Sequence, residues 1–278
     1  MEVPISVITV SHNHAAYVDR ALSALLPEVD RVGGEVIWID NRSDDDSADR
    51  VRNYHQVQLF VNRKRRGFSA NNNYGMALAR GRYLLLLNPD TEVRSGALQT
   101  LIDFMDTHLQ VGLCGAKLLF PDGTIQPSAR RFPTLSSFIA RRTPLRVFLR
   151  ESKFNQHHLM ADLDRSLPQE IDWLLGACLC VRQAVLETVG PLDEGFFLYV
   201  EDIDWARRIC DNGWQVYYVP EAAIVHHHIA VSDKRFFSRY TWLHFQSMLR
   251  YVRKHFLPPI PLLAVRENET EVWDETRH

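Results

Sequence analysis

Long hydrophobic runs are absent from this 278-residue sequence. No stretch approaches the roughly 18 consecutive apolar residues that a membrane-spanning helix needs. The N-terminus does not resemble a signal peptide, because Glu2 and Pro4 lead directly into a strand-like run. A strong excess of one charge is missing too, since the formal net charge is −2, which argues against a nucleic-acid partner. We therefore expect a cytoplasmic protein.

Cysteine is scarce, and two common nucleotide-binding motifs are missing. The four cysteines are Cys114, Cys178, Cys180 and Cys210, and none belongs to a CxxC pair. Buried free thiols in a reducing compartment are the expected result. No G-x-G-x-x-G follows the first strand-like run, and no Walker lysine motif occurs, which argues against a dehydrogenase and against a P-loop NTPase.

Strand-like and helix-like patterns alternate over the first 120 residues. Strands are expected at 5–10, 36–39, 57–61, 83–87 and 111–119, and helices around 17–25, after 43–47, at 69–79 and at 95–105. The strands are continuously apolar, as in Leu84–Leu87, rather than alternating. Such strands are typical of a parallel sheet covered on both faces. We predict an α/β fold with a mixed, mostly parallel central sheet and helices on both faces.

The pattern changes after residue 120. We expect a hairpin at 120–124, a long loop or mobile insertion at 129–168, a strand at 171–181, a helix at 182–189, an acidic helix within 196–213, and closing strands at 214–219 and 223–227. A basic, aromatic-rich helix is expected at 234–256. No repeat or linker is visible. We therefore predict one domain over 1–256, with halves at about 1–120 and 121–233, and a tail at 257–278.

Polar clusters follow four successive strands. They are Ser11–Asn13, Asp40–Ser43, Asn62–Ser69 and Asn88–Asp90. Each alone could be loop polarity and helix capping, but ligands of open parallel sheets bind beyond the carboxyl ends of the strands. Carboxylates there suit ribose hydroxyls, a base N–H, or a divalent cation that bridges a diphosphate. Pro89 restricts the backbone around Asp90, which makes Asp90 a candidate cation ligand.

Two further clusters each allow two interpretations. Glu201, Asp202 and Asp204 follow an apolar run at an expected helix start. They could complement the helix dipole, or one could be a partly desolvated general base. The triple histidine His226–His228 could be a surface accident or could supply a divalent-metal ligand.

The polar clusters described above and the stretches around them, in this order along the chain, resemble the family 2 glycosyltransferases with the GT-A fold, a Rossmann-like nucleotide-sugar-binding fold. The resemblance is strongest to the rhamnosyltransferase-like branch. It covers about residues 3–256. The matching stretches are VITVSHNHAAYVDRALSAL, WIDNRSDDDSAD, NRKRRGFSANNNYG, LLLLNPDTEV, GAKLLFPDGTIQPSARRFPT, WLLGACLCVRQAVLETVGPLDEGFFLYVEDIDWARR and VHHHIAVS. The PDGTIQPSARRFPT stretch is the one that points to the rhamnosyl branch.

The resemblance implies roles for individual residues. Donor-binding residues would be Ser11, Asn13, Asp40, Asn62, Gly67, Asn71 and Asp90; acceptor residues would be Trp173 and Gly176. Asp90 would also bind Mg²⁺ or Mn²⁺ together with His226. Asn88 stands where many relatives have the first aspartate of the DxD motif. Asp202 would be the catalytic base, with Glu201 beside it in the acceptor site.

The expected function is an inverting, metal-dependent hexosyltransferase. The resemblance implies a nucleoside-diphosphate sugar donor (dTDP-rhamnose or a UDP-sugar) and a glycan or polyprenyl-linked acceptor in cell-surface polysaccharide synthesis. Alternatives are another hexose donor, a catalytically silent nucleotide-sugar-binding module, and a histidine-based metal-binding protein. For Gly176, close approach of the acceptor and plain core packing both remain open.

The helix expected at 234–256 also allows two interpretations. It could dock on its own domain, or it could lie on an anionic membrane, which would place the protein peripherally on the inner face of the cell membrane. Arginines of the irregular segment could contribute to that surface or close over the donor as a lid. They are Arg130, Arg131, Arg141, Arg142 and Arg146.

Overall fold

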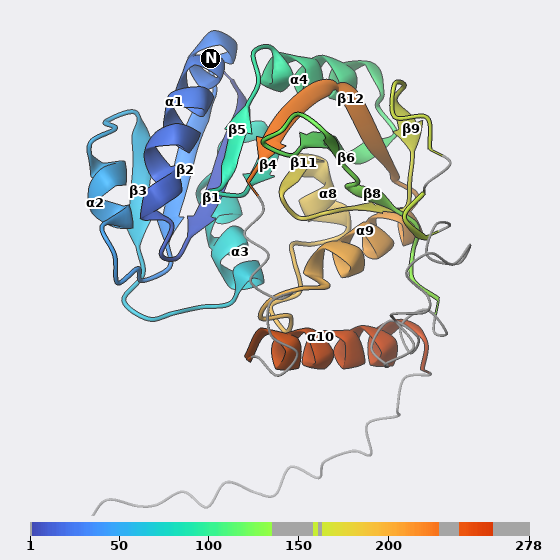
Figure 1. Ribbon diagram of the computed structural model, residues 1–278. Helices are drawn as coiled ribbons and strands as arrows, with labels where there is room; N and C mark the ends of the chain where they lie inside the picture. Colours follow the sequence, from blue (N-terminus) through green and yellow to red (C-terminus); the bar gives the residue numbers. More distant parts are fainter. Residues whose placement is uncertain (1, 135–157, 161–162, 228–238, 258–278) are drawn as a thin grey trace, which may run out of the picture.

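The structure is a computed structural model, and it describes residues 2–134, 158–160, 163–227 and 239–257. Arg141, Arg142, Arg146, His228 and the predicted helix start at 234 lie outside these residues. Figure 1 shows a central sheet with helices packed on it and helix α10 (Arg239–His255) along one end. Within the described residues, no helix combines the length and the apolar character needed to cross a bilayer.

The main sheet has the strand order β3-β2-β1-β4-β11-β6-β12-β5. The bounds are β1 Val3–Ser11, β2 Glu35–Asp40, β3 Val57–Val61, β4 Gly81–Leu87, β5 Thr91–Val93, β6 Val111–Leu119, β11 Cys178–Arg182 and β12 Gln215–His226. Strands β1 to β4 are parallel, β11 runs antiparallel between β4 and β6, and β12 is parallel to β6. Short strands β7 (Ile125–Gln126) and β9 (Gln169–Glu170) extend the sheet, and β8 (Ala129–Arg130) pairs separately with β10 (Trp173–Leu174). The predicted mixed sheet is confirmed.

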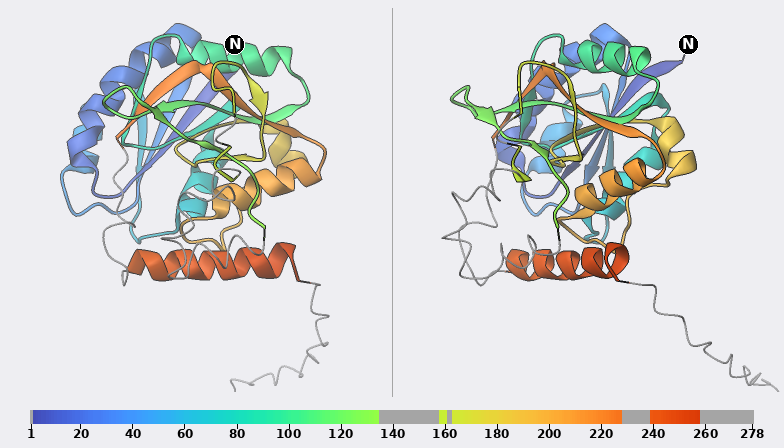
Figure 2. Two further views of the ribbon diagram at one scale, coloured as in Figure 1. Left: turned by 45° about the vertical axis from the view of Figure 1, so that its right-hand side comes forward. Right: turned by 90° about the vertical axis from the view of Figure 1, so that its right-hand side faces the viewer.

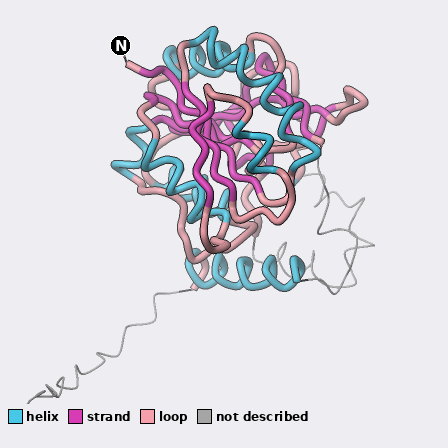
Figure 3. The backbone as a smooth tube through the Cα atoms, turned by 90° about the vertical axis from the view of Figure 1, so that its left-hand side faces the viewer, coloured by secondary structure: helices cyan, strands magenta, loops and turns pink. Residues whose placement is uncertain are grey.

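Helices cover both faces of this sheet. On one face lie α1 (Ala15–Val32), α2 (Ser47–Arg52) and α4 (Ala97–Thr107). On the other lie α3 (Phe68–Leu78), α8 (Gln183–Thr188), α9 (Glu201–Asp211) and α10. The two sets stand on opposite sides of the twisted strand layer in Figures 2 and 3.

The leucine run of β4 explains why its strand is continuously apolar. Leu85 and Leu87 belong to the core under α1 and α4, whereas Leu84 and Leu86 belong to the core on the opposite face. Successive strand side chains point to opposite faces, so both sets must be apolar when both faces are covered. Burying each leucine stabilises the fold by roughly 1.5–3 kcal/mol.

Two strand predictions were wrong in detail. The single strand expected at 171–181 is two strands in different sheets, because the chain bends at Leu175–Ala177, where Leu175 donates to the Ser128 carbonyl and Ala177 accepts from Asn88. The two closing strands are one strand, β12, with a register shift between Val219 and Ala223. Pro220 lies in this shift, where it cannot donate to the ladder.

Other boundaries also differ. The expected loop at 129–168 contains strand β8 in its described part. Helix α9 begins only at Glu201, and the residues before it are not helical, because Tyr199 and Val200 have positive φ angles of 69° and 70°. The hairpin at 120–124 is confirmed, with Gly123 at φ 86° and its N–H donated to the Phe120 carbonyl. All four cysteines are free, and three are buried.

Candidate functional site

Asp90 and His226 are brought together by strand pairing. Strand β5 pairs antiparallel with the end of β12, so that Thr91 lies opposite His226, and the His227 N–H donates to the Asp90 carbonyl at 2.9 Å. The Asp90 Oδ1 and His226 Nε2 atoms lie 3.4 Å apart, and both side chains are buried. Residues from distant parts of the chain therefore form one oxygen–nitrogen donor pair at the carboxyl edge of β4.

A third residue, Gln126 of strand β7, orients this histidine. His226 Nδ1 lies 2.8 Å from Gln126 Oε1, and both side chains are about 5% exposed. A carbonyl oxygen can only accept, so Nδ1 carries the proton in this contact and Nε2 faces Asp90. A ring held in this way presents Nε2 as a metal ligand. Gln126 was missed in the sequence because it follows a turn motif and carries no charge.

The Asp90–His226 pair fits a divalent cation that is also bound by substrate phosphates. Magnesium sites commonly use one or two protein carboxylates plus phosphate oxygens and water. Among the described residues, no group of three or more His, Cys, Asp or Glu side chains could hold a metal alone. His14, which the sequence analysis did not select, interacts electrostatically with Asp90. Burial lowers the pKa of His14, and the negative charge of Asp90 acts in the opposite direction.

Asp202 lies in the first turn of α9. Its Oδ2 accepts the Gly176 N–H at 3.1 Å, and its Oδ1 accepts the Ile203 N–H at 2.9 Å. Burial raises the pKa of Asp202 to about 6, although these two N–H groups and the charge of Arg130 favour the ionised form. Such a carboxyl group is ionised at neutral pH and is more basic than an exposed aspartate, as a general base requires.

Glu201, the neighbour of Asp202, lacks the backbone partners that Asp202 has. It is buried, and its Oε2 has no hydrogen-bond partner among the described residues. Burial, and next the charge of Asp202, raise its pKa well above the ordinary value. Asp202 therefore has two backbone N–H groups that favour its ionised form, whereas Glu201 Oε2 accepts from none of the described residues.

The backbone before α9 is strained. Val200 precedes Glu201 in the left-handed region, which is unfavourable for a β-branched residue by roughly 1–3 kcal/mol. The Asp204 N–H donates to the Val200 carbonyl, so Val200 accepts the first hydrogen bond of helix α9. The strained conformation therefore sets the direction of the turn that carries Asp202.

Two hydrogen bonds connect Asp202 to the Asp90 region. Asp202 accepts from Gly176, and the next residue, Ala177, accepts from the N–H of Asn88 at 3.0 Å. Asn88 is two residues before Asp90. A Cβ placed on Gly176 would meet only Asp202 among the described residues, at an ordinary 3.6 Å from Oδ2. Core packing therefore does not require this glycine, whereas a side chain there would stand beside the carboxylate.

On the donor side, the predicted residues mainly shape the loops. Asp40 is 1% exposed and accepts from the Ser43 N–H (2.9 Å), the Ser43 hydroxyl (2.5 Å) and the Ser11 hydroxyl (3.4 Å). Ser11 is equally buried and also accepts from Trp38 Nε1 at 2.8 Å. Asn13 is exposed at φ 59°, and its side-chain oxygen accepts the Asp44 N–H. Contacts of these residues with a nucleotide stay predictions.

An asparagine network holds the next loop. The Asn62 amide donates to Asn41 and to Asn71, and Asn41 also bonds the backbone of Arg66 in both directions. Asn71 is fully buried, and its side-chain amide donates to the backbone carbonyls of Arg66 and Gly67 in this loop. A Cβ on Gly67 would lie 3.0 Å from the Phe197 Cα and carbonyl oxygen. Gly67 therefore permits the donor-side loop to pack against the segment that leads into α9.

Trp173 is buried rather than open to the site. Its exposed fraction is 6%, and its Nε1–H donates to the Arg131 carbonyl at 2.9 Å. Its predicted contact with an acceptor stays a prediction. The side chain of His227, beside the metal candidate His226, contacts Glu92 and the Tyr17 ring, so only the backbone N–H of His227 reaches Asp90.

Comparisons with known proteins give consistent results. The model of a family described as "Glycosyl transferase family 2" matches residues 6–188. The N-acetylglucosaminyl-diphospho-decaprenol L-rhamnosyltransferase of Mycobacterium tuberculosis is 28% identical over 239 residues, which are 80% of this chain and 75% of that protein. Rhamnosyltransferase WbbL of Escherichia coli is 28% identical over 266 residues, 90% of this chain and 94% of that protein.

A solved structure shows the fold. GalNAc-T7, crystallised with UDP, GalNAc and Mn²⁺, superposes with a TM-score of 0.66 at 16% sequence identity. The match covers 91% of this chain and 48% of GalNAc-T7, so the chain spans about half the length of that structure. At this identity, the likeness concerns the fold alone.

Proposed function

The chain belongs to glycosyl transferase family 2, and from this premise we propose that it transfers rhamnose, with inversion, from a nucleoside-diphosphate sugar to a glycan or lipid-linked acceptor. Family membership and the predicted GT-A fold are both confirmed. The family makes the chain a hexosyltransferase, whereas the donor, the acceptor, the metal and the role of each residue belong to the proposal. So does the assignment of residues 1–256 to one domain.

One observation carries the proposal. The Asp202 carboxylate, whose pKa is raised to about 6, is connected through Gly176, Ala177 and Asn88 to the edge where Asp90 and His226 meet. A base and a candidate diphosphate site thus lie on the same edge of one sheet. Glycosyl transfer with inversion needs these two elements: a base for the acceptor hydroxyl and charge stabilisation for the departing diphosphate.

In the proposed reaction, Asp202 accepts the proton of the acceptor hydroxyl. The hydroxyl oxygen forms a bond to the anomeric carbon. The bond from that carbon to the diphosphate oxygen breaks, and its electron pair leaves with the diphosphate oxygen. Attack opposite the leaving group inverts the configuration. The raised pKa of Glu201 favours its neutral form, so Asp202 is the carboxylate assigned to accept this proton. A bound Mg²⁺ or Mn²⁺ at Asp90 and His226 would stabilise negative charge on the diphosphate as a Lewis acid.

The donor proposal has dTDP-rhamnose first and a UDP-sugar second. Support comes from the two relatives, both named rhamnosyltransferases. The Mycobacterium tuberculosis relative is named for a diphospho-decaprenol acceptor, which favours a polyprenyl-linked acceptor here and a peripheral location on the inner face of the cell membrane. A histidine-based metal-binding protein finds no support among the described residues.

A panel of nucleotide sugars tests the donor. We expect dTDP-rhamnose with Mn²⁺ to raise the melting temperature more than UDP-glucose, UDP-N-acetylglucosamine or GDP-mannose, because a ligand that binds only the folded state stabilises it. Slow release of dTDP should accompany binding. Stabilisation without release, even with a lipid-linked acceptor, would indicate a silent nucleotide-sugar-binding module. Preference for a UDP-sugar would contradict the rhamnosyl assignment.

Gln126→Ala tests the proposed metal ligand His226 while leaving the histidine itself in place. The imidazole loses the group that fixes its orientation, so we expect Mn²⁺ affinity in the presence of donor to fall about 10–100-fold. Manganese titration followed by electron paramagnetic resonance measures this affinity. Gln99→Ala, at an exposed position of α4, is the matched control. Unchanged Mn²⁺ affinity in Gln126→Ala would show that His226 is not a ligand.

A further inference from the structure

Helix α10 has one buried and one exposed face. Tyr251 is fully buried, and the Ser247 hydroxyl donates to the Leu198 carbonyl at 2.9 Å. On the opposite face, Trp242, Phe245 and Leu249 are 59%, 47% and 60% exposed. Their spacing of three and four residues places them in one stripe. Of the two interpretations of this helix, docking on its own domain thus applies to one of its faces.

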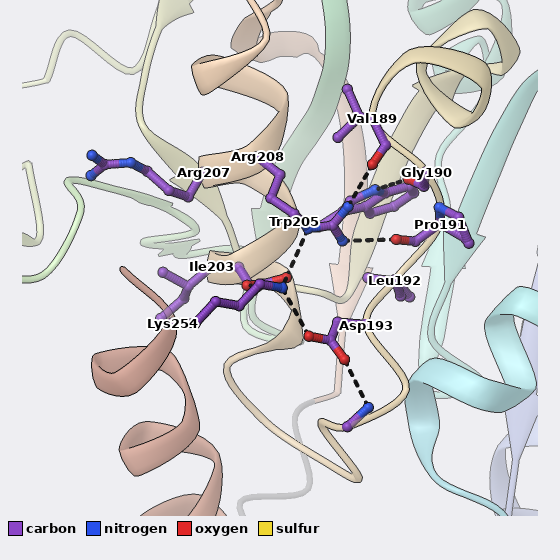
Figure 4. A network of polar contacts seen from close by, with 12 residues as sticks. Val189, Gly190, Pro191, Leu192, Asp193, Ile203, Trp205, Arg207, Arg208 and Lys254 are labelled. Atoms are coloured by element: carbon purple, nitrogen blue, oxygen red, sulfur yellow. Dashed lines mark hydrogen bonds and ion pairs between the residues drawn. The ribbon is translucent and has the colours of Figure 1, made fainter. Parts of the chain in front are cut away.

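Ion pairs fix which face points outward. Lys254 lies 2.8 Å from Asp193 and 2.9 Å from Asp204, and Arg250 also pairs with Asp193. Asp204 is fully buried in the first turn of α9. Figure 4 shows Lys254 reaching toward Asp193. Burial alone would raise the pKa of Asp193, but Lys254 and the other donors around it bring that pKa to about 2, so the contacts persist at neutral pH.

The same network connects α10 to the helix of the proposed base. Besides Lys254, Asp204 accepts from His255 of α10 at 2.8 Å and from Arg208 of its own helix at 2.9 Å. Figure 4 also shows Arg208 donating to the carbonyls of Val189 and Pro191. The exposed stripe of α10 is thus held rigidly relative to Asp202, two residues before Asp204.

The outer face combines apolar and basic character. Residues 239–257 contain no Asp or Glu. The rings of Trp242 and Phe245 stack at 5.8 Å, and Phe256 extends the stripe at 38% exposure. Arg253 is exposed next to this stripe and makes no hydrogen bond or ion pair with described residues. A face with exposed Trp, Phe and Leu beside cations is typical of helices that lie at a membrane surface.

A second group of cations lies at the same end of the molecule. Arg63, Lys64, Arg65 and Arg66 are consecutive and exposed, and their side chains make no hydrogen bond or ion pair with described residues. Gly67, the next residue, packs against Phe197, and the residue after Phe197 is Leu198, which accepts from Ser247 of α10. We name residues 63–66 the basic loop. Figure 1 shows α10 at the end of the molecule where β3 finishes and the basic loop begins.

We propose that the outer face of α10, together with the basic loop, docks the protein on an anionic phospholipid membrane. The charge favours this occupant, because cations next to a membrane are attracted to an anionic surface and residues 239–257 contain no carboxylate side chain to oppose that attraction. The inference deepens the proposed function, since it names the surface at which a lipid-linked acceptor would be met. Docking would bring α9 and Asp202 to the membrane surface in a fixed orientation.

Vesicle flotation of the full chain tests this proposal. The protein is expected to float with phosphatidylcholine–phosphatidylglycerol vesicles, to bind phosphatidylcholine alone more weakly, and to dissociate as salt rises. Phe245→Ser/Leu249→Ser should weaken partitioning by about tenfold or more, because two apolar side chains no longer enter the bilayer. Leu109→Ser/Leu167→Ser, at two exposed leucines elsewhere, is the matched control and should bind like the parent chain.

Two further measurements separate the possible results. Donor hydrolysis in the absence of lipid should be unchanged in Phe245→Ser/Leu249→Ser, so loss of docking and failure of the proposed function are distinguishable. Failure of the parent chain to bind anionic vesicles, or equal binding by the α10 variant, would overturn the proposal. So would sedimentation showing a dimer that this variant dissociates, because the stripe would then be an interface between copies of the chain.

Discussion

Replacing Asp202 with Asn should nearly abolish glycosyl transfer, with turnover reduced about 10³-fold or more. The amide has almost the same size and can still accept the Gly176 N–H through its oxygen, so the first turn of α9 should be preserved. It cannot accept the proton of an acceptor hydroxyl. Donor affinity, measured by calorimetry with the nucleotide sugar and Mn²⁺, should stay within about twofold, because the base acts on the acceptor.

Two variants of the same helix control this result. Asp211→Asn, at the exposed end of α9, removes a carboxylate without touching the site and should retain full activity. Glu201→Gln mimics the neutral acid that burial favours and should also retain most activity near neutral pH. If Asp202→Asn weakens donor binding and spares turnover, the base assignment is wrong.

The pH profile should follow the same carboxylate. The base must be ionised to accept a proton, and its pKa is about 6. Lowering the pH protonates it, so kcat/KM should fall below about pH 6, by about tenfold per pH unit. A profile that stays flat well below pH 6 would contradict the assignment of Asp202.

Replacing Asp90 with Asn should reduce kcat/KM by about 10²-fold or more. The side chain keeps its size next to His226 but loses the charge that would attract a divalent cation. Added Mn²⁺ should therefore fail to strengthen donor binding in the variant, whereas it should do so in the parent chain. Thermal shift with donor, with and without Mn²⁺, measures this dependence.

The control for this substitution is Asp103→Asn, at an exposed position of α4. It should leave the response to Mn²⁺ unchanged. If Asp90→Asn responds to Mn²⁺ as the parent chain does, Asp90 is not the metal ligand. If neither protein responds, the glycosyl transfer does not depend on a metal, and the proposal would be limited to the base and the donor pocket.

Much of the first half of the fold could be predicted, because local patterns determine it. The run Leu84–Leu87 is apolar at every position since the two faces of β4 belong to two different cores. Strands 57–61 and 111–119 have the predicted bounds. Motif order also predicted the family and directed attention to Asp90, Asp202 and His226.

The arrangement of the candidate site depends on contacts between residues far apart in the chain, which no local sequence pattern contains. The acidic start of α9 is equally compatible with a helix dipole and with a base, and only burial in the folded chain raises the pKa values of Glu201 and Asp202. Gln126 is inconspicuous in the sequence, yet pairing of β7 with β6 brings it to His226. Strained Val200 could not be anticipated either, since valine disfavours that conformation.

Local patterns predicted the strands and the sheet edge with its polar loops, because apolar periodicity and loop polarity are encoded over a few residues, and the resemblance to the family proposed roles for the candidate side chains. The protonation state of each carboxyl group, the orientation of His226 and the outward face of α10 came from folding. These properties depend on desolvation and on partners far away in the chain, and both exist only once the elements have packed.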